Sequence, residues 1–216
     1  MQIQSISVAD AVADELRRRL LSGHYRGGTQ LRDTELSEEF SVARPTVRAA
    51  VAMLVADGLL ERGRGRSAEV KSFSAEDAVD LYRLRRAIEA AAVRKVIAEC
   101  RSLDDVEAAT RAFAGLPETV SWDAVADHDV AFHRAVFAAA GSTRLLRTFD
   151  EVSAEHRLLI ALLRPAYGSV AELAREHQLL LDALRGGDTD SALAALSEHF
   201  DESERFFLDQ IMERAL

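Results

Sequence analysis

Cysteine is nearly absent from this sequence, since Cys100 is the only one among 216 residues. One cysteine excludes an intrachain disulfide and a zinc site built from several thiolates. No apolar run approaches the ~18 residues of a membrane-spanning helix, and the N-terminus has no signal-peptide core. We therefore expect a cytoplasmic protein with no membrane partner. Proline is also scarce, at three residues, which favours helices along most of the chain.

Residues 36–56 carry two short helical patterns joined by a tight turn. In the first, Leu36 and Phe40 share one helical face, and the periodicity then breaks. A second helix is predicted to begin near residue 44, and its apolar spacing leaves the polar N-terminal residues facing outward. In a helix-turn-helix, that end of the second helix reaches base edges in the major groove. The candidate DNA-contacting residues are Arg44, Thr46 and Arg48.

A segment rich in glycine and arginine follows these two helices. Gly58 suits the left-handed end of the second helix, and residues 59–70 then alternate like two short strands. Such a hairpin would be a wing whose arginines contact phosphates or a minor groove. Each arginine alone could equally be a solvated surface residue, but the order of helix, turn, helix and wing favours DNA binding. The wing arginines are Arg62, Arg64 and Arg66.

Charge is unevenly distributed between the two parts of the chain. Residues 42–71 hold six basic and three acidic residues, although the whole chain has a net charge of −9. An acidic protein with one basic segment localises its phosphate-binding surface there. From residue 71 onward, 26 acidic residues outnumber 17 basic ones, so we expect no second nucleic-acid surface.

The sequence predicts a mainly α protein with two domains. Residues 1–70 would form a winged helix-turn-helix, residues 71–76 a linker, and residues 77–216 an all-α antiparallel helical bundle. Ser74, with Asp77 three residues later, resembles a helix N-cap at the start of the bundle. The predicted bundle helices span residues 75–100, 103–114, 120–140, 143–163, 169–185 and 189–214.

The predicted bundle contains a candidate metal site. Asp129 and His133 are four residues apart, so they project from one helical face. His177 and His199 flank a glycine turn and would lie within roughly one helical turn of the same level. One carboxylate and three imidazoles suit a divalent transition metal, zinc first, with nickel or manganese as alternatives. Hydrogen-bonded Asp–His pairs on a protein surface share this spacing, so the same residues could also be arranged without a metal. Two histidines without partners at a suitable spacing are His128 and His156.

Residues 8–70 resemble the winged helix-turn-helix domain of the GntR family of bacterial transcription regulators. The motifs that carry the resemblance are "LRRRLLSGHYRGGTQL" and "ELSEEFSVARPTVRAAVAMLVADGLLE". The resemblance implies a first helix, roughly residues 8–22, packed behind the helix-turn-helix. It also implies DNA contacts from the arginine that opens the recognition helix, the arginine four residues later and the wing tip. These are Arg44, Arg48 and Arg64 to Arg66, while Thr34 and Ala43 depart from the residues usual in the family.

Residues 76–210 resemble the FCD effector domain of the FadR-type branch of these regulators, through "LYRLRRAIEAAA", "DHDVAFH" and two "EH" pairs. The resemblance implies that Arg85, four residues before Glu89, faces a cavity and helps to bind a carboxylate effector. Arg85 could equally form a salt bridge at the surface. Six helices instead of seven suggest the shorter, vanillate-regulator-like subgroup, and Ser142 replaces an asparagine common in the family. The implied metal ligands are Asp129, His133, His177 and His199.

Together these features predict a homodimeric DNA-binding transcription regulator. Two-fold symmetry would match two half-sites of a palindromic operator in double-stranded DNA. A small carboxylate effector, bound at the metal and paired with Arg85, would control operator affinity. One alternative is a metal-dependent hydrolase, although Glu176 and Glu198 are expected to point away from the ligand face and so provide no general base. Another is a regulator whose metal is purely structural.

Overall fold

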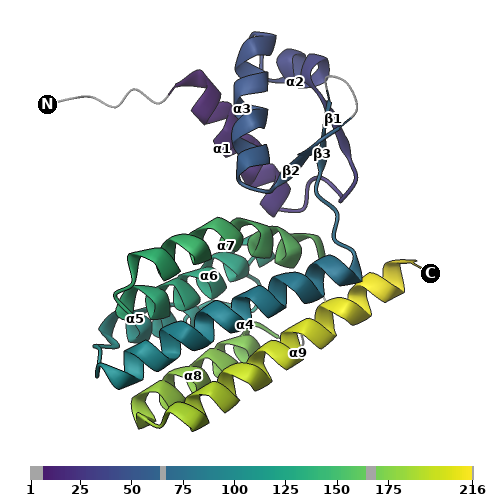
Figure 1. Cartoon of the computed structure of the whole chain (residues 1–216). Helices are drawn as coiled ribbons and strands as arrows, with labels where there is room; N and C mark the ends of the chain where they lie inside the picture. Colours follow the sequence, from purple (N-terminus) through teal and green to yellow (C-terminus); the bar gives the residue numbers. More distant parts are fainter. Residues whose placement is uncertain (1–6, 64–66, 164–168, 216) are drawn as a thin grey trace, which may run out of the picture. The chain divides into compact units, whose positions relative to one another are not determined.

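The computed structural model describes residues 7–63, 67–163 and 169–215. The chain divides into two compact units, Met1–Ser72 and Phe73–Leu216, which Figure 1 colours from purple to blue and from blue to yellow. Within the described ranges, no helix is long and apolar enough to cross a membrane. The wing residues Arg64 and Arg66 lie outside the described part of the chain.

In its described part, residues 7–63 and 67–72, the first unit contains three helices and a small sheet (Figure 1). Helix α1 packs against α3, as the resemblance implied, through an apolar face that includes Leu16 and Leu20. Ser7 caps α1 in a reciprocal capping box with Asp10, which satisfies two backbone N–H groups at the helix start. The helices are α1 (Val8–Leu21), α2 (Asp33–Glu39) and α3 (Arg44–Ala56).

The turn between α2 and α3 is tight because Ser41 adopts a left-handed conformation, with a φ of 53°. Ser37 helps to close this turn by donating a hydrogen bond from its hydroxyl to the carbonyl of Val42. Gly58 follows α3 with a φ of 72°, which confirms the predicted left-handed helix end. The two helices are thereby joined as a helix-turn-helix.

The strands described in the first unit are three, short and antiparallel, with β3 in the middle. Leu31 pairs with Ala68 on one side of β3, and Leu60 pairs with Val70 on the other. All four of these side chains are buried, so the sheet packs its apolar face against the helices. The prediction of a winged helix-turn-helix is confirmed. The strands are β1 (Gln30–Arg32), β2 (Leu60–Arg62) and β3 (Ser67–Val70).

The second unit contains six helices within the described residues, as predicted. Ser74 caps the first of them in a capping box with Asp77, which confirms the expected N-cap. The assignment to a particular subgroup stays a prediction. The helices are α4 (Ala75–Ala98), α5 (Asp104–Ala114), α6 (Trp122–Ala139), α7 (Thr143–Leu163), α8 (Val170–Gly186) and α9 (Thr189–Ala215).

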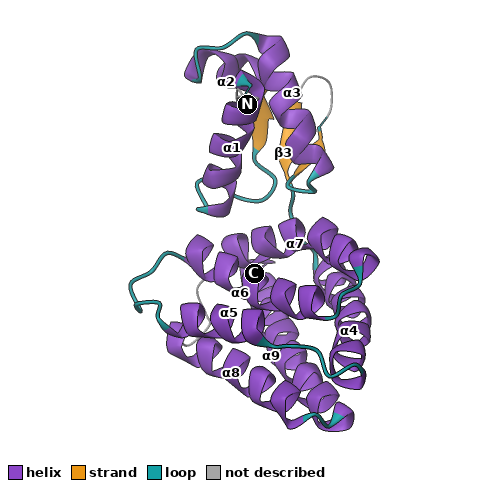
Figure 2. Ribbon diagram, turned by 90° about the vertical axis from the view of Figure 1, so that its left-hand side faces the viewer, coloured by secondary structure: helices purple, strands orange, loops and turns teal. Residues whose placement is uncertain are grey.

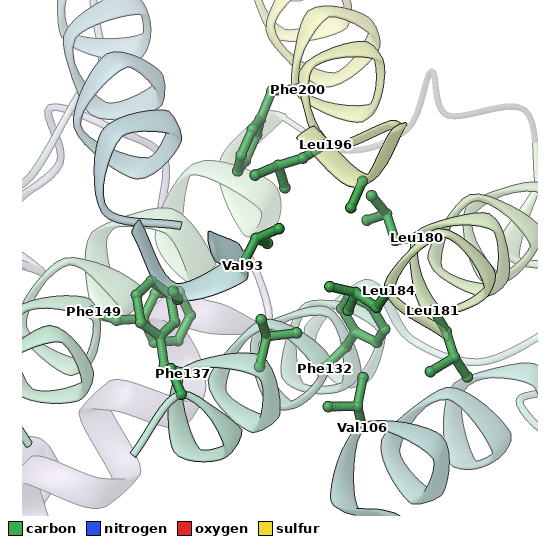
Figure 3. Close-up of a cluster of buried hydrophobic side chains, with 14 of the residues drawn as sticks. Val93, Val106, Phe132, Phe137, Phe149, Leu180, Leu181, Leu184, Leu196 and Phe200 are labelled. Atoms are coloured by element: carbon green, nitrogen blue, oxygen red, sulfur yellow. The ribbon is translucent and has the colours of Figure 1, made fainter. Parts of the chain in front are cut away.

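Helix α4 occupies a central position in this bundle, with contacts to α6, α7, α8 and α9. Figure 1 shows α8 and α9 as an antiparallel hairpin on one side of α4, with α6 and α7 on the other. Figure 2 shows α5 between α6 and α8, and α5 packs against both. Gly187 turns the hairpin in a left-handed conformation, with a φ of 71°. Apolar residues from these helices form a large buried cluster, in which Phe137 stacks on Phe149 at 4.6 Å between ring centroids (Figure 3), and a smaller cluster that includes Phe113 and Leu173.

Several bundle helices carry ionisable residues on their buried faces. On α4, Arg85 and Glu89 follow Leu81 and Tyr82 at helical spacing and precede Val93, so they lie on the apolar stripe. A charged side chain in a bundle interior is costly unless other polar groups satisfy it. These residues therefore point to a polar site inside the bundle.

Candidate metal centre and DNA interface

Three helices bring the four predicted metal-site residues together. Asp129 and His133 come from α6, His177 from α8 and His199 from α9, and all four are buried. Each offers one ligand atom, and these atoms lie within 4.8 Å of one another. The short α8–α9 turn explains why His177 and His199 are level, with ring centroids 5.0 Å apart. The cluster could hold a metal ion.

Each histidine in this cluster is oriented by an acceptor on its Nδ1 side. His133 Nδ1 donates to Glu89 Oε2 at 2.6 Å, His177 Nδ1 to the Leu173 carbonyl at 2.8 Å, and His199 Nδ1 to Glu176 Oε2 at 3.2 Å. A neutral imidazole that carries its proton on Nδ1 presents a lone pair on Nε2. These acceptors therefore leave each Nε2 available as a ligand.

Two of the Nε2 atoms face the same carboxylate oxygen. His177 Nε2 lies 3.3 Å and His133 Nε2 lies 3.9 Å from Asp129 Oδ1. Among the residues that the structure describes, neither Nε2 has a hydrogen-bond partner, nor has Asp129 Oδ2. Lone pairs directed at a carboxylate repel it, and a buried unsatisfied polar atom is destabilising. A cation placed among these atoms removes both problems, so the donor set fits a divalent metal.

Glu89 links this cluster to Arg85. The carboxylate accepts a hydrogen bond from Arg85 Nε at 3.0 Å through Oε1, while Oε2 accepts from His133. Burial alone would raise the pKa of Glu89, but His133 and Arg85 lower it to about 2, so the group is a carboxylate at neutral pH. Burial lowers the pKa of His133 to about 4, so this imidazole is neutral at pH 7.

Arg85 is fully buried and points into the bundle, which excludes the surface salt bridge as its role. Its Nη1 donates to His156 Nε2 at 2.7 Å, and its guanidinium carbon lies 4.9 Å from the ring centre of Phe200. Arg85, His156, Asp129 and His199 are among the residues that line a cavity of about 20 Å³. The cavity therefore connects the predicted effector residue with the metal cluster.

Two expectations about nearby residues were wrong. His156 was predicted to have no partners at a suitable spacing, but it is buried on α7, and its Nδ1 lies 3.5 Å from Asp129 Oδ2. Burial, followed by the charge of Arg85, holds its pKa well below 6.5. Glu176 was expected to point away from the ligands, but it accepts the hydrogen bond from His199, because the side chain reaches across the α8–α9 hairpin. Glu198 is exposed.

The first unit presents its arginines around concave surfaces. Arg44 and Arg48 are exposed one turn apart on α3, with Thr46 half-buried between them. Arg44 and Arg48 line one hollow of about 400 Å³ together with Arg32. Arg48 also borders a second hollow, of about 260 Å³, together with Arg62 from the wing. The recognition helix and the described part of the wing thus form one basic surface.

Comparison with known proteins assigns both units. The family of "Bacterial regulatory proteins, gntR family" matches residues 8–70, and the FCD domain matches residues 80–202, which is more than half of the chain. The chain belongs to the GntR family and carries an FCD domain. It is therefore a DNA-binding transcription regulator and not an enzyme.

This GntR regulator resembles curated relatives over most of its length. It is 26% identical over 194 residues to a probable D-xylose utilization operon transcriptional repressor of Paenarthrobacter nicotinovorans, covering 89% of this chain and 85% of the relative. It is 23% identical over 199 residues to the gluconate operon transcriptional repressor of Bacillus licheniformis, covering 88% and 81%. A crystal structure of a GntR protein from Rhodococcus sp. RHA1 aligns with a TM-score of 0.80 and 27% identity, over 93% of this chain and 97% of that one.

Three residues were not assigned from the sequence to the sites described above: His156 and Glu176 at the metal cluster, and Arg32 beside α3. His156 lies on the apolar stripe of α7, between Phe149 and Ile160, and a polar residue on such a stripe was the available signal. Arg32 directly precedes α2 and carries no helical signal of its own. Glu176 was overlooked because its neighbour His177 occupies the buried face of α8.

Proposed function

We propose that this GntR regulator binds a palindromic operator as a homodimer and that a small carboxylate effector, bound at a metal in the FCD domain, controls its operator affinity. The observation that carries the proposal is the convergence of Asp129 with His133, His177 and His199 beside the buried cation of Arg85. Zinc is the first choice of metal, and nickel and manganese also suit imidazole and carboxylate ligands. The chemistry that the metal supplies is Lewis-acid coordination of a carboxylate oxygen.

The metal assignment is tested by elemental analysis of the purified full-length protein. We expect one metal per chain, and His133→Ala and His177→Ala should lose it, because each removes a buried nitrogen from the cluster. His128→Ala is the matched control, since His128 lies on α6 but hydrogen-bonds to the Ala124 carbonyl. Full occupancy in both cluster variants would remove these residues as ligands.

The effector assignment depends on Arg85. A guanidinium next to a metal can hold a carboxylate through one oxygen on each. Calorimetric titration of the metal-loaded protein with small carboxylic acids should detect binding, and Arg85→Lys should weaken it at least tenfold while metal content stays unchanged. Equal binding by wild type and Arg85→Lys would exclude Arg85 as an effector contact.

The chain itself connects the effector site with the DNA-binding unit, through helix α4. Arg85 lies on α4, which begins at Ala75, and only four residues separate Ala75 from the end of strand β3 at Val70. A ligand shifts operator affinity only if it binds two conformations of the protein unequally. Since Glu89 connects Arg85 on α4 with His133 on α6, ligation at the metal favours one placement of α4 relative to α6.

The DNA contacts are tested by fluorescence polarisation with the DNA upstream of the regulator's own gene. Arg44→Ala and Arg48→Ala should each weaken specific binding by about 1–3 kcal/mol, a factor of roughly 5–150. Arg147→Ala, at an exposed arginine of α7, is the control for loss of one positive charge. Unchanged affinity in the α3 variants would exclude them as operator contacts. Light scattering on the same sample measures whether the protein is a dimer.

A metal with a purely structural role is the competing proposal. It predicts a large metal-dependent rise in melting temperature but no effect of any carboxylic acid on operator binding. The cavity beside the cluster favours the effector role, because a structural site does not require a cavity lined by a buried arginine. Operator release by an acid in the metal-loaded protein, and its absence after chelation, distinguishes the two.

A further inference from the structure

The cavity beside the metal cluster has two walls of different character. One consists of Arg85, His156, Asp129 and His199, and the other is largely apolar. The polar wall is continuous, since Arg85 Nη1 lies 2.7 Å from His156 Nε2 and His156 Nδ1 lies 3.5 Å from Asp129. The remaining lining residues are Tyr82, Trp122, Ile160, Leu173, Ser203, Phe206 and Phe207.

The second wall is built mainly from aromatic rings. Tyr82 lies 5.8 Å from Phe207, and Phe206 lies 5.2 Å from Phe207, measured between ring centroids. The Tyr82 hydroxyl is 3.4 Å from His156 Nε2, so the two walls meet at this pair. Ile160 and Leu173 add buried aliphatic side chains. A ligand held by the polar wall would therefore place the rest of its structure against apolar groups.

The polar groups of the lining set a limit on the polar groups of a ligand. Arg85 is the one cationic side chain among the described residues that line the cavity, and together with the proposed metal it matches one carboxylate. Beyond the polar wall, the described lining offers only three further polar groups, the hydroxyls of Tyr82 and Ser203 and the indole N–H of Trp122. A sugar acid brings several hydroxyls, and burying them without partners reduces affinity. With the first carboxylate held at Arg85 and the metal cluster, a second carboxylate would lie against the apolar wall, where the described lining offers no cation.

We propose that the effector is a monocarboxylic acid with an apolar, preferably aromatic, body, and not a sugar acid or a dicarboxylate. This inference rests on the proposed function, because the carboxylate is placed at the metal cluster and Arg85. Ring-to-ring packing against Phe206, Phe207 and Trp122 then supplies affinity that hydroxylated acids lack. A ligand of this size requires the cavity to enlarge, and we assign that movement to the half-buried rings of Trp122 and Phe206.

Calorimetric titration of the metal-loaded full-length protein with four acids tests the proposal. The probes are 3-phenylpropionate, hexanoate, gluconate and succinate. We expect 3-phenylpropionate to bind at least tenfold more tightly than gluconate or succinate, with hexanoate between them. Equal or tighter binding of gluconate or succinate would overturn this inference and leave the proposed function standing. If none of these four acids binds, and no acid from a broader set of carboxylic acids binds either, the proposed function is overturned as well.

Variants of the cavity wall give a second, independent readout. Ile160→Thr keeps the β-branch, removes the terminal methyl group and adds a hydroxyl to the apolar wall, so 3-phenylpropionate affinity should fall about fivefold to tenfold while gluconate affinity does not fall. Leu179→Thr, at an exposed leucine of α8, is the matched control and should change neither.

Ser203→Ala provides a further test if Ile160→Thr is poorly folded. Replacing serine by alanine adds no volume, so we expect this variant to fold. Removing this hydroxyl should leave 3-phenylpropionate affinity unchanged or raise it. A tenfold loss would show that Ser203 hydrogen-bonds a polar ligand group, which contradicts an apolar body. Circular dichroism melting curves of each variant measure whether the fold is retained.

Discussion

Glu89 is the residue that connects the two parts of the bundle site, Arg85 and the metal cluster. One carboxylate oxygen accepts from Arg85 and the other from His133, and the side chain is fully buried. A carboxylate here fixes the His133 proton on Nδ1 and leaves Nε2 as a ligand. The same group neutralises Arg85 in an environment where an unpaired charge is strongly destabilising. Because Glu89 contacts both Arg85 and His133, replacing Glu89 tests the effector contact and the metal ligand together.

Glu89→Gln should weaken metal binding by roughly 10–100-fold, the usual effect of losing a partner of a ligating histidine. The glutamine must present its amide N–H₂ either to Arg85 or to His133 Nδ1, and the second orientation shifts the His133 proton to Nε2. Competition with a fluorescent chelator measures the change. Glu198→Gln, at an exposed carboxylate beside His199, is the control and should bind metal like the wild type. Wild-type affinity in Glu89→Gln would contradict this role.

Acid should destabilise the metal-free protein through His133. Burial holds its pKa at about 4 in the folded protein, against 6.5 for the free group, so between these values the unfolded chain binds a proton that the native state does not. The free energy of unfolding therefore rises with pH in this window and falls by up to about 3 kcal/mol between pH 6.5 and pH 4. His156, whose pKa is also lowered, acts in the same direction. Urea unfolding at pH 7.5 and pH 5 measures the difference, and equal midpoints would contradict it.

The four candidate ligands could be predicted at the residue level because their spacing is local information. Asp129 and His133 share a face by helical periodicity, and the glycine turn fixes the level of His177 against His199. His156 could not be placed in this way, since its partners Arg85 and Asp129 lie on other helices and only tertiary packing brings them together. Whether Arg85 is inside or outside was left open, yet its place on the Leu81–Val93 stripe of α4 decides it.

At the scale of elements, the α8–α9 hairpin supplies two of the three histidines and depends on its turn. Helix boundaries within it were predicted to within one residue, because Gly187 ends α8 in a conformation that glycine adopts without strain. The turn between α2 and α3 is different, because a left-handed conformation at Ser41 is not signalled by its residue type. Sequence therefore predicted the position of that turn but not its geometry.

Two neighbouring glycines at the hairpin should respond oppositely to alanine. Gly187→Ala forces a β-carbon into a left-handed backbone, at a cost of about 1 kcal/mol, although the carbon itself would meet nothing within 4 Å. Gly186→Ala, also with open space around it but at the end of α8, should be neutral or stabilise by up to about 0.5 kcal/mol. Thermal unfolding of both variants gives the comparison, and equal effects would contradict the assigned turn.

At the scale of the whole molecule, the two units differ sharply in charge. Residues 1–72 hold 11 basic and 10 acidic residues, whereas residues 73–216 hold 16 basic and 26 acidic ones. DNA is therefore attracted by a local group of arginines and repelled by the bundle as a whole. This division into a DNA-binding unit and an acidic helical unit was visible in the sequence.

Removing the metal should destabilise the bundle selectively. A ligand at 1,000 times its dissociation constant adds about 4 kcal/mol to stability, which corresponds to a shift in melting temperature of roughly 10 °C for a domain of this size. Chelation should thus lower the melting temperature of the bundle, as measured by scanning calorimetry. Hydrogen exchange of α1 and α3 should stay unchanged, since the ligands lie only on α6, α8 and α9. Loss of protection in the first unit alone would contradict a metal in the bundle.

The small volume of the cavity also determines how fast the regulator can respond. About 20 Å³ accommodates roughly one water molecule, whereas a carboxylic acid of ten heavy atoms requires several times that space. Binding must then wait for the bundle to open, on the microsecond-to-millisecond scale of helix displacements, instead of occurring at every encounter. In stopped-flow mixing, the observed rate would reach a plateau at high acid concentration, and that plateau is the opening rate that limits how quickly the operator is released.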